Sequence, residues 1–206
     1  HAGDKNSMVS TLKLAKQYGV KAGAHPSFVD REHFGRQEQK VPSQLLKKQL
    51  IHQIGSLIEL ANMEKMKIFH VKAHGALYNL CARSEEMAEL FIETINDFSE
   101  ELCIFVPYGS VIEKLAKERG ISYMTEAFAD RNYDSALNLL PRSHPKAVLN
   151  DPVNIRNRAL RMLKEKVIKT AEGKDLSINF DTLCVHGDHP NAVQILMELN
   201  KLRTII

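Results

Sequence analysis

Short apolar runs alternate along the chain with longer stretches in which apolar residues recur every three or four positions. The short runs predict β-strands at 20–24, 68–73, 103–106, 121–126 and 183–186. The longer stretches predict helices at about 4–19, 43–65, 84–98, 110–119, 151–173 and 190–202. Strands that alternate with helices pair in parallel through βαβ units, which predicts an α/β fold in a single domain, residues 1–206.

Several predicted helix starts carry a capping residue. Asp4 and Ser7 precede the first helix, Ser84 the third and Asp151 the fifth. Pro152 follows Asp151, and proline is favoured in the first helical turn.

Composition excludes several classes of protein. The 206 residues are 44% hydrophobic and 26% charged, as in an ordinary globular protein. The net charge of +3 comes from basic and acidic residues that are intermixed, and Trp is absent, which argues against a nucleic-acid-binding face. No apolar stretch is long enough to span a bilayer.

The three cysteines, Cys81, Cys103 and Cys184, have no zinc-type spacing. Unpaired thiols fit a reducing compartment, so we expect a cytoplasmic protein. The chain begins at His1 without an initiator Met, and we expect that upstream sequence is missing.

Polar residues gather where the predicted strands end. The four clusters are His25-Pro26-Ser27, Lys72-Ala73-His74-Gly75, Glu126 to Arg131, and His186-Gly187-Asp188. In a parallel α/β barrel, functional side chains come from the carboxyl ends of the strands. This common location predicts an active site. The glycines Gly75 and Gly187 indicate tight turns at two of these ends.

Strand periodicity adds a geometric expectation. Side chains two positions apart point the same way, so His70, Lys72 and His74 should share one face, and His186 and Asp188 another. An inward lysine requires a compensating anion, which suits Lys72 to hold an anionic substrate group.

Ordinary structural roles compete with these interpretations. A single histidine at a strand end is most often a hydrogen-bonded structural residue, and His33, His52, His144 and His189 have no special setting. Asp130 and Arg131 could form a simple ion pair across a loop. The sequence contains neither GxxxxGK[ST] nor GxGxxG, so any ATP is not held by a Walker loop of this chain.

These strand ends carry motifs that resemble the LamB/YcsF family in order along nearly the whole chain. The matching segments are His1-Ala2-Gly3-Asp4, Gly23-Ala24-His25-Pro26-Ser27 with Asp30, Phe34-Gly35-Arg36, Val71 to Asn79, Glu126 to Arg131 with Tyr133, Pro141-Arg142, and Cys184 to Asp188 with Pro190. The chain departs from the family pattern at Ala73, His33, Gln37, Lys146 and Ala136-Leu137. The last pair stands where Asp-Gly is typical, and these loop changes leave the exact substrate open.

The resemblance implies a parallel β/α barrel of the seven-stranded glycoside hydrolase/deacetylase type. Five strands are predicted here, so the chain would lack two N-terminal strands of that barrel. The fold type also suggests a setting in carbohydrate metabolism.

The resemblance further implies ATP-dependent ring opening of 5-oxoproline to glutamate. The chain would then be the A component of a 5-oxoprolinase, its partners would be the B and C subunits together with a small-molecule substrate, and ATP would be used by the complex. A homo-oligomer is compatible with the sequence, and a divalent metal remains open.

Site roles follow from the same resemblance. The predicted catalytic residues are Lys72, His74, Glu126, Asp130, His186 and Asp188. The predicted substrate-binding residues are His25, Asp30, Arg36, Tyr78, Arg131 and Arg142. His74 or His186 would act as general base or acid, oriented by Asp130 or Asp188.

Two other functions stay open at this point. One is a metal-dependent deacetylase or amidohydrolase acting on a carbohydrate or small amide, with His1, Asp4, His25 and His74 as candidate ligands. The other is a non-catalytic subunit that binds a lactam or a sugar.

Overall fold

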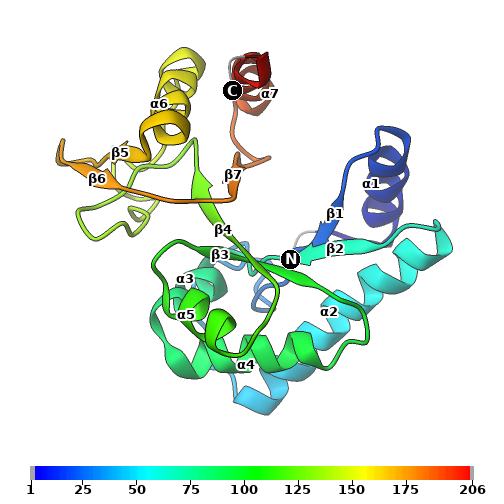
Figure 1. Cartoon of the computed structure of the whole chain (residues 1–206). Helices are drawn as coiled ribbons and strands as arrows, with labels where there is room; N and C mark the ends of the chain where they lie inside the picture. Colours follow the sequence, from blue (N-terminus) through cyan, green and yellow to red (C-terminus); the bar gives the residue numbers. More distant parts are fainter. Residues whose placement is uncertain (1–2, 205–206) are drawn as a thin grey trace. The chain divides into compact units, whose positions relative to one another are not determined.

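The computed structural model describes residues 3–204 as alternating strands and helices (Figure 1). In chain order the elements are α1 (Lys5–Gln17), β1 (Ala22–Ala24), α2 (Ser43–Met63), β2 (Ile68–Val71), α3 (Gly75–Arg83), α4 (Glu85–Asn96), β3 (Cys103–Pro107), α5 (Val111–Glu118), β4 (Tyr123–Phe128), α6 (Pro152–Glu165), β5 (Val167–Lys169), β6 (Asp175–Ser177), β7 (Thr182–Cys184), α7 (Ala192–Asn200) and the 3-10 helix η1 (Lys201–Thr204).

The main sheet confirms the α/β prediction. Its five strands follow the order β1-β2-β3-β4-β7, and the pairs β1–β2, β2–β3 and β4–β7 are parallel. The chain divides into two compact units, His1–Met124 and Thr125–Ile206.

In the first unit, helices cover the strands β1 to β3. Helix α2 packs against β1 and β2, while α3 and α5 pack against β3 (Figure 1). The apolar face of α2 is buried at Leu46, Leu50, Ile54 and Ala61, and Leu57 on the same face is half-buried. These apolar side chains exclude water from one side of the strands.

In the second unit, α6 and α7 pack against each other (Figure 1). Ile155 of α6 and Ile195 of α7 form a buried cluster with Ala129, which directly follows β4. This cluster anchors the segment after β4, on which Asp130 and Arg131 lie, while Glu126 of the same motif lies in β4 itself.

The predicted caps Asp4, Ser84 and Asp151 are confirmed, whereas Ser7, which was predicted to precede the first helix, lies inside α1. The Asp4 carboxylate accepts the Ser7 amide at 2.8 Å, and the Ser7 hydroxyl in turn accepts the Asp4 amide, which completes a capping box at α1. Ser84 caps α4, and Asp151 caps α6 with Pro152 in its first turn.

Two stretches differ from the elements that the apolar pattern predicts. Helix α3 begins at Gly75, where the sequence indicates only a tight turn, and its capping residue is His74. The predicted helix 151–173 is too long: α6 ends at Glu165, and Lys166 takes a left-handed conformation before the antiparallel pair β5–β6. The apolar spacing around Val167 fits a helix, but Val167 lies in β5.

The loop after β4 contains a non-glycine residue in the left-handed region. Leu137 has φ +62°, at the position where the family pattern has glycine. It lies in a turn in which the Asp134 carboxylate accepts the amides of Ala136 and Asn138 at 2.8 and 2.9 Å. The Ala136-Leu137 departure therefore keeps the turn and adds backbone strain.

Replacing Leu137 with glycine should raise the free energy of unfolding by about 1 kcal/mol, because glycine adopts this φ without steric cost. Chemical denaturation of the two proteins measures the change. Leu139→Gly, in a neighbouring residue that bridges to Tyr133, is the matched control and should destabilise. A destabilised Leu137→Gly protein would contradict this explanation.

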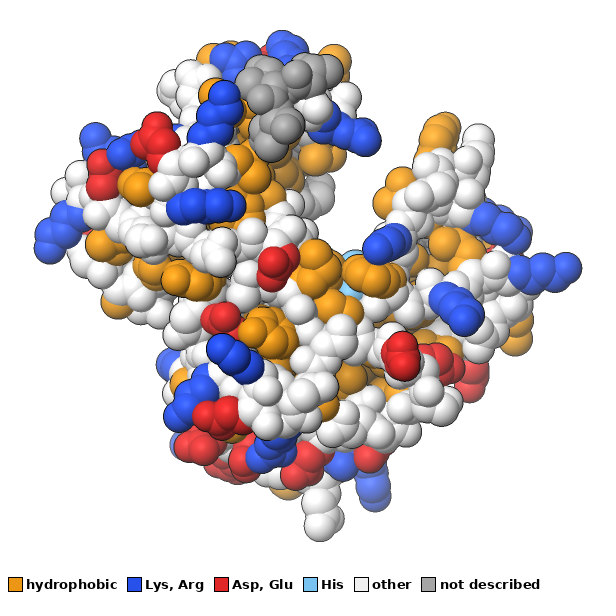
Figure 2. All heavy atoms as spheres, in the orientation of Figure 1, with side chains coloured by type: hydrophobic (Ala, Val, Ile, Leu, Met, Phe, Trp, Pro, Cys, Tyr) orange, Lys and Arg blue, Asp and Glu red, His pale blue; other side chains and the backbone are white. Residues whose placement is uncertain are grey.

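Charged side chains are intermixed on the face seen in Figure 2, as the composition predicts. Within residues 3–204, no helix is both long enough and apolar enough to cross a membrane.

Candidate functional site

Two histidines meet at the carboxyl ends of β1 and β2 in the first unit. The amide of Lys72 donates to Ala24 O at 2.9 Å and that of His74 to Pro26 O at 2.8 Å, so the two chain segments stay paired beyond the strands. As a result, His25 Nε2 lies 3.0 Å from His74 Nδ1, with the rings edge to face. We call His25 and His74 the imidazole pair.

Both outer nitrogens of the imidazole pair contact backbone carbonyls. His25 Nδ1 lies 2.6 Å from Lys72 O, and His74 Nε2 lies 2.8 Å from Phe34 O. A carbonyl oxygen can only accept, so each of these nitrogens carries a hydrogen. The pair thus links the end of β2 to the Phe34-Gly35 turn.

The pKa of His25 is lowered to about 3 by burial, by the nearby Lys72 ammonium and by His74. His25 is therefore neutral at physiological pH. A role as a hydrogen-bonding group therefore suits His25 better than a role as a cation.

His70 lies in a separate set of contacts. Its ring stacks on Phe105 with centroids 3.9 Å apart, and it fills the space beside Gly23, where a Cβ would lie 2.3 Å from the ring. Burial, Lys72 and Lys21 lower the pKa of His70 to about 4. The strand ends at Val71, so the predicted alternation does not run on to His74.

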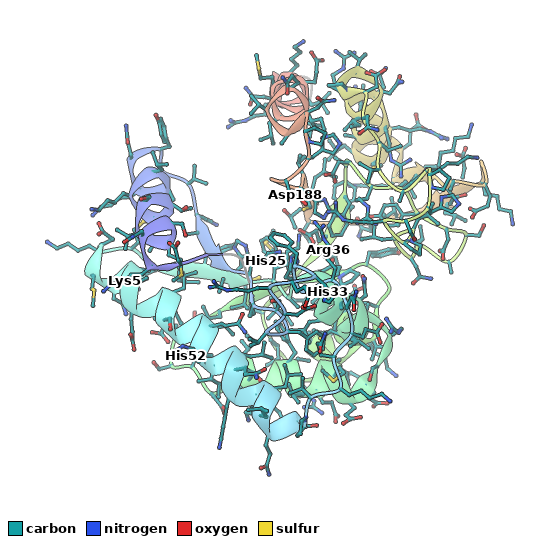
Figure 3. The ribbon with its side chains drawn as sticks, turned by 180° about the vertical axis from the view of Figure 1, so that it is seen from behind. Lys5, His25, His33, Arg36, His52 and Asp188 are labelled. Carbon is teal, nitrogen blue, oxygen red and sulfur yellow. The ribbon has the colours of Figure 1, made fainter. Side chains whose placement is uncertain are left out.

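Of the other candidates of the first unit, Asp30 and Arg36 lie in the loop between β1 and α2, Lys72 directly follows β2, and Tyr78 lies in α3. Figure 3 labels Arg36 together with His33 of the same loop. Asp30 binds the His33 ring at 3.0 Å and the His33 amide at 3.1 Å. The Arg36 guanidinium lies 4.9 Å from the Phe34 ring centroid, and the Lys72 ammonium 5.7 Å from that of Tyr78. Tyr78 is buried, and Lys72 is half-buried.

An aspartate and a histidine form the centre of the second unit's candidate site. Asp130 follows β4 and His186 follows β7, its parallel neighbour. His186 Nδ1 lies 3.0 Å from both Asp130 oxygens, and the His186 amide donates to Oδ2 at 2.9 Å. The carboxylate is an acceptor, so Nδ1 carries the hydrogen, and whenever the ring is neutral the lone pair is on Nε2.

Packing holds this Asp130–His186 dyad in place. Asp130 is 1% exposed, and the Phe128 ring stacks on His186 with centroids 5.3 Å apart. The Tyr133 hydroxyl accepts the Phe128 amide at 2.8 Å. Tyr133 thereby fixes the segment that carries Asp130, a role that the sequence did not reveal.

Burial alone would raise the pKa of Asp130, but the hydrogen bonds and charge of His186 outweigh it, and the pKa falls below the ordinary 3.8. A lowered carboxylate pKa adds stability above pH 3.8, and that stability is lost as pH falls through the folded-state pKa.

The stability difference between the wild type and Asp130→Asn should therefore shrink as pH drops below about 4. Urea denaturation at a series of pH values measures it for both proteins. A difference that stays constant from about pH 7 to about pH 2 would show that Asp130 is not held as a carboxylate.

The contacts of Arg131 and Asp130 do not support a simple ion pair between these two residues. Its guanidinium donates to the carbonyls of Leu140 and Ala147, and Asp130 binds His186 instead. Arg131 is 6% exposed and Glu126 is 4% exposed, so both predicted site residues lie inside the unit.

Asp188 and Arg142 are exposed and lie together, with Arg142 Nη2 3.6 Å from Asp188 Oδ1. Of the two carboxylates predicted to orient a histidine, Asp130 holds His186, and Asp188 faces Arg142. The strand ends at Cys184, so strand alternation does not place His186 and Asp188 on one face.

Three of the four candidate metal ligands lie in the part of the chain that the structure describes, and each of them has other contacts. His1 lies outside the described residues, Asp4 caps α1, and His25 and His74 have both ring nitrogens in the contacts given above. Within residues 3–204, no group of three or more His, Cys, Asp and Glu side chains could hold a metal ion.

The remaining histidines differ in role. His52 is exposed on α2 (Figure 3), and the Nδ1 of exposed His144 accepts the Lys146 amide. His189 is buried and binds Leu149 O at 2.9 Å, a structural role. His33, considered ordinary from the sequence, binds the predicted site residue Asp30, a contact across three residues that spacing alone does not indicate.

Comparison with known proteins agrees with these strand-end motifs. The model of the LamB/YcsF family matches residues 1–204. A protein of Pyrococcus abyssi that is named as the A subunit of 5-oxoprolinase is 38% identical over 98% of this chain and 79% of its own length. One of Pyrococcus furiosus with the same name is 40% identical over 95% of this chain and 76% of its own.

A solved structure is also similar. The lactam utilization protein from Thermus thermophilus matches with a TM-score of 0.91 and 33% identity, over 100% of this chain and 82% of that chain. These names refer to 5-oxoprolinase and lactam utilization, and they do not support the expected setting in carbohydrate metabolism. The chain belongs to the LamB/YcsF family.

Proposed function

We propose that this chain is the A subunit of an ATP-dependent 5-oxoprolinase, which opens the ring of 5-oxoproline to give glutamate. The proposal is supported by relatives that carry this name and match at least 95% of the chain. Under this proposal, the B and C subunits are partners of this chain. We expect the complex to work in the cytoplasm.

The observation that carries an enzymatic role is the Asp130–His186 dyad. Ring opening adds water across the amide C–N bond, and the attacking water must lose a proton while the leaving nitrogen gains one. His186, with Nδ1 held by Asp130, offers Nε2 as the group that moves these protons. We therefore assign the general base or acid to His186 and its orientation to Asp130.

ATP explains how a resonance-stabilised lactam can be opened. Transfer of the γ-phosphoryl group to the amide oxygen would make the ring carbon a better electrophile, and phosphate then leaves after water attacks. Cationic side chains stabilise the negative charge of such groups. Lys72, Arg131 and Arg142 are proposed to bind carboxylate or phosphoryl oxygens, and Arg131 also holds the loop carbonyls of Leu140 and Ala147.

The other predicted site residues keep proposed roles in the same reaction. Glu126 is a second proton-transfer candidate, and Asp188 sets the position of Arg142. Asp30, Arg36 and Tyr78 are proposed to bind substrate. For the fold, we propose a single β/α-barrel domain of the seven-stranded type, to which this chain contributes five strands.

Reconstitution tests the function. The chain, mixed with purified B and C subunits, ATP and 5-oxoproline, should release glutamate and ADP in equal amounts, and omission of the chain should stop both. Glutamate release that needs a divalent metal but not ATP would favour the metal-dependent amidohydrolase. Binding of 5-oxoproline without turnover by the complete complex would favour a non-catalytic role.

A further inference from the structure

We propose that Tyr133 is a positioning residue for His186 and that it acts through the aromatic ring of Phe128. The Tyr133 hydroxyl holds the backbone amide of Phe128, and the Phe128 ring in turn covers one face of the His186 imidazole. The inference rests on the proposed function for one point only, the role of His186 as general base or acid. All three residues lie in the second unit.

The Phe128 amide lies at the end of β4 and points away from β7. Amides of successive residues in a strand point to opposite sides, and the amide of the next residue, Ala129, donates to Cys184 O beside it at 2.9 Å. Phe128 is 3% exposed, and a buried amide without an acceptor is costly. The Tyr133 hydroxyl accepts this amide at 2.8 Å and so takes the place of a strand carbonyl.

Tyr133 is itself fixed, so its hydroxyl has a defined position. Its carbonyl accepts the Ala171 amide at 2.9 Å, and its backbone forms an antiparallel bridge with Leu139. Tyr133 is buried, and burial raises the pKa of its hydroxyl. The group therefore stays a neutral hydroxyl at physiological pH, with an oxygen that accepts the Phe128 amide.

Two contacts set the orientation of the His186 ring. The Asp130 carboxylate holds Nδ1 at 3.0 Å, and the Phe128 ring lies against one face with the centroids 5.3 Å apart and 22° between the ring planes. The hydrogen bond alone lets the ring tilt about Nδ1, whereas an aromatic ring packed on its face restricts that tilt. A shift of Phe128 would thus change the direction of Nε2 and leave the contact with Asp130 in place.

This direction is what proton transfer depends on. The His186 side chain is 23% exposed, and Nε2 is the ring nitrogen that does not bind Asp130. Small displacements of a reacting group slow the chemical step much more than they weaken substrate binding. Tyr133 therefore controls the aim of the general base or acid, although its hydroxyl contacts neither His186 nor Asp130 in the hydrogen bonds given above.

NMR of the histidine ring C–H signals tests the link between Tyr133 and His186. A stacked aromatic ring shifts the His186 signals upfield, and Phe128→Leu, which lacks that ring, gives their position without the stack. We expect the His186 signals of Tyr133→Phe to move toward the Phe128→Leu position. Wild-type signals in a folded Tyr133→Phe chain would overturn the inference. Because this measurement needs no 5-oxoproline, it decides the link even if the proposed function fails.

Kinetics of the complete complex tests the consequence for catalysis. Tyr133→Phe keeps the ring and removes only the hydroxyl, and we expect kcat for 5-oxoproline to fall about 10- to 100-fold with KM within about threefold. Tyr123→Phe, at the opposite end of β4, is the matched control and should keep the wild-type kcat and the wild-type His186 signals. A wild-type kcat in Tyr133→Phe would show that Tyr133 does not position His186.

Phe128→Leu tests the second step by itself. It keeps the backbone amide that Tyr133 binds and removes the stacked ring, so its kcat should fall to a similar degree. Thermal unfolding checks that each variant is folded. A folded Phe128→Leu complex with the wild-type kcat would refute the inference even where Tyr133→Phe does not fold, because Tyr133 reaches His186 through this ring.

Discussion

Replacing His186 with glutamine should lower kcat for ATP-dependent conversion of 5-oxoproline to glutamate by about 10²–10⁴-fold, the usual contribution of a general acid or base. Glutamine can still donate toward Asp130, but its amide cannot take up the proton of the attacking water. Because Asp130 and His186 are held by β4 and β7, the fold should persist, and thermal unfolding of the variant checks this.

Asp130→Asn should also lower kcat for the conversion of 5-oxoproline to glutamate. The carboxylate requires a hydrogen on His186 Nδ1, whereas an asparagine amide can donate and so allows the opposite tautomer, with Nε2 blocked. His144→Gln, an exposed change in the same unit, is the matched control and should keep full activity. Wild-type turnover by either dyad variant would remove the dyad from the mechanism.

Gly75→Ala should destabilise the protein by about 2–5 kcal/mol, the largest stability effect that we expect. Gly75 has φ +56°, and a Cβ there would lie 2.4 Å from the backbone oxygen of Gly35. The added methyl group therefore combines a left-handed backbone with a clash against the turn that carries Phe34. Chemical denaturation measures the loss.

Gly120→Ala separates these two causes. Gly120 has φ +66°, but nothing lies within 4 Å of a Cβ built on it. Its replacement should cost only the backbone strain, about 1–2 kcal/mol. Equal losses at both positions would show that the contact between α3 and the Gly35 turn does not restrict Gly75.

The sequence predicted those parts of the fold that depend on local patterns. Apolar periodicity located the five strands of the main sheet, and Asp4, Ser84 and Asp151 marked helix starts because capping needs only neighbouring residues. Helix α3 was missed because its first residue is a glycine whose role depends on a distant loop. The β5–β6 pair was missed because Val167 continues the helical spacing of α6.

The candidate site was predicted as a set of residues but not as a set of contacts. The motifs named Asp130 and His186, yet spacing could not decide whether Asp130 binds Arg131 or His186, because that choice depends on the pairing of β4 with β7. The roles of Phe34 O and Lys72 O were not visible at all, since backbone carbonyls leave no residue signature. At Leu137 the sequence showed a departure from the family pattern but not its effect. The left-handed φ of this residue explains the effect, which is added backbone strain in the turn.

Chemical rescue tests the central claim most directly. A complex that contains His186→Gly should make glutamate from 5-oxoproline slowly, and added imidazole should restore the rate in proportion to its concentration, because a free ring can take the place of the missing base next to Asp130. A His186→Gly complex that turns over at the wild-type rate without imidazole would contradict the assignment of His186 as the group that moves the protons.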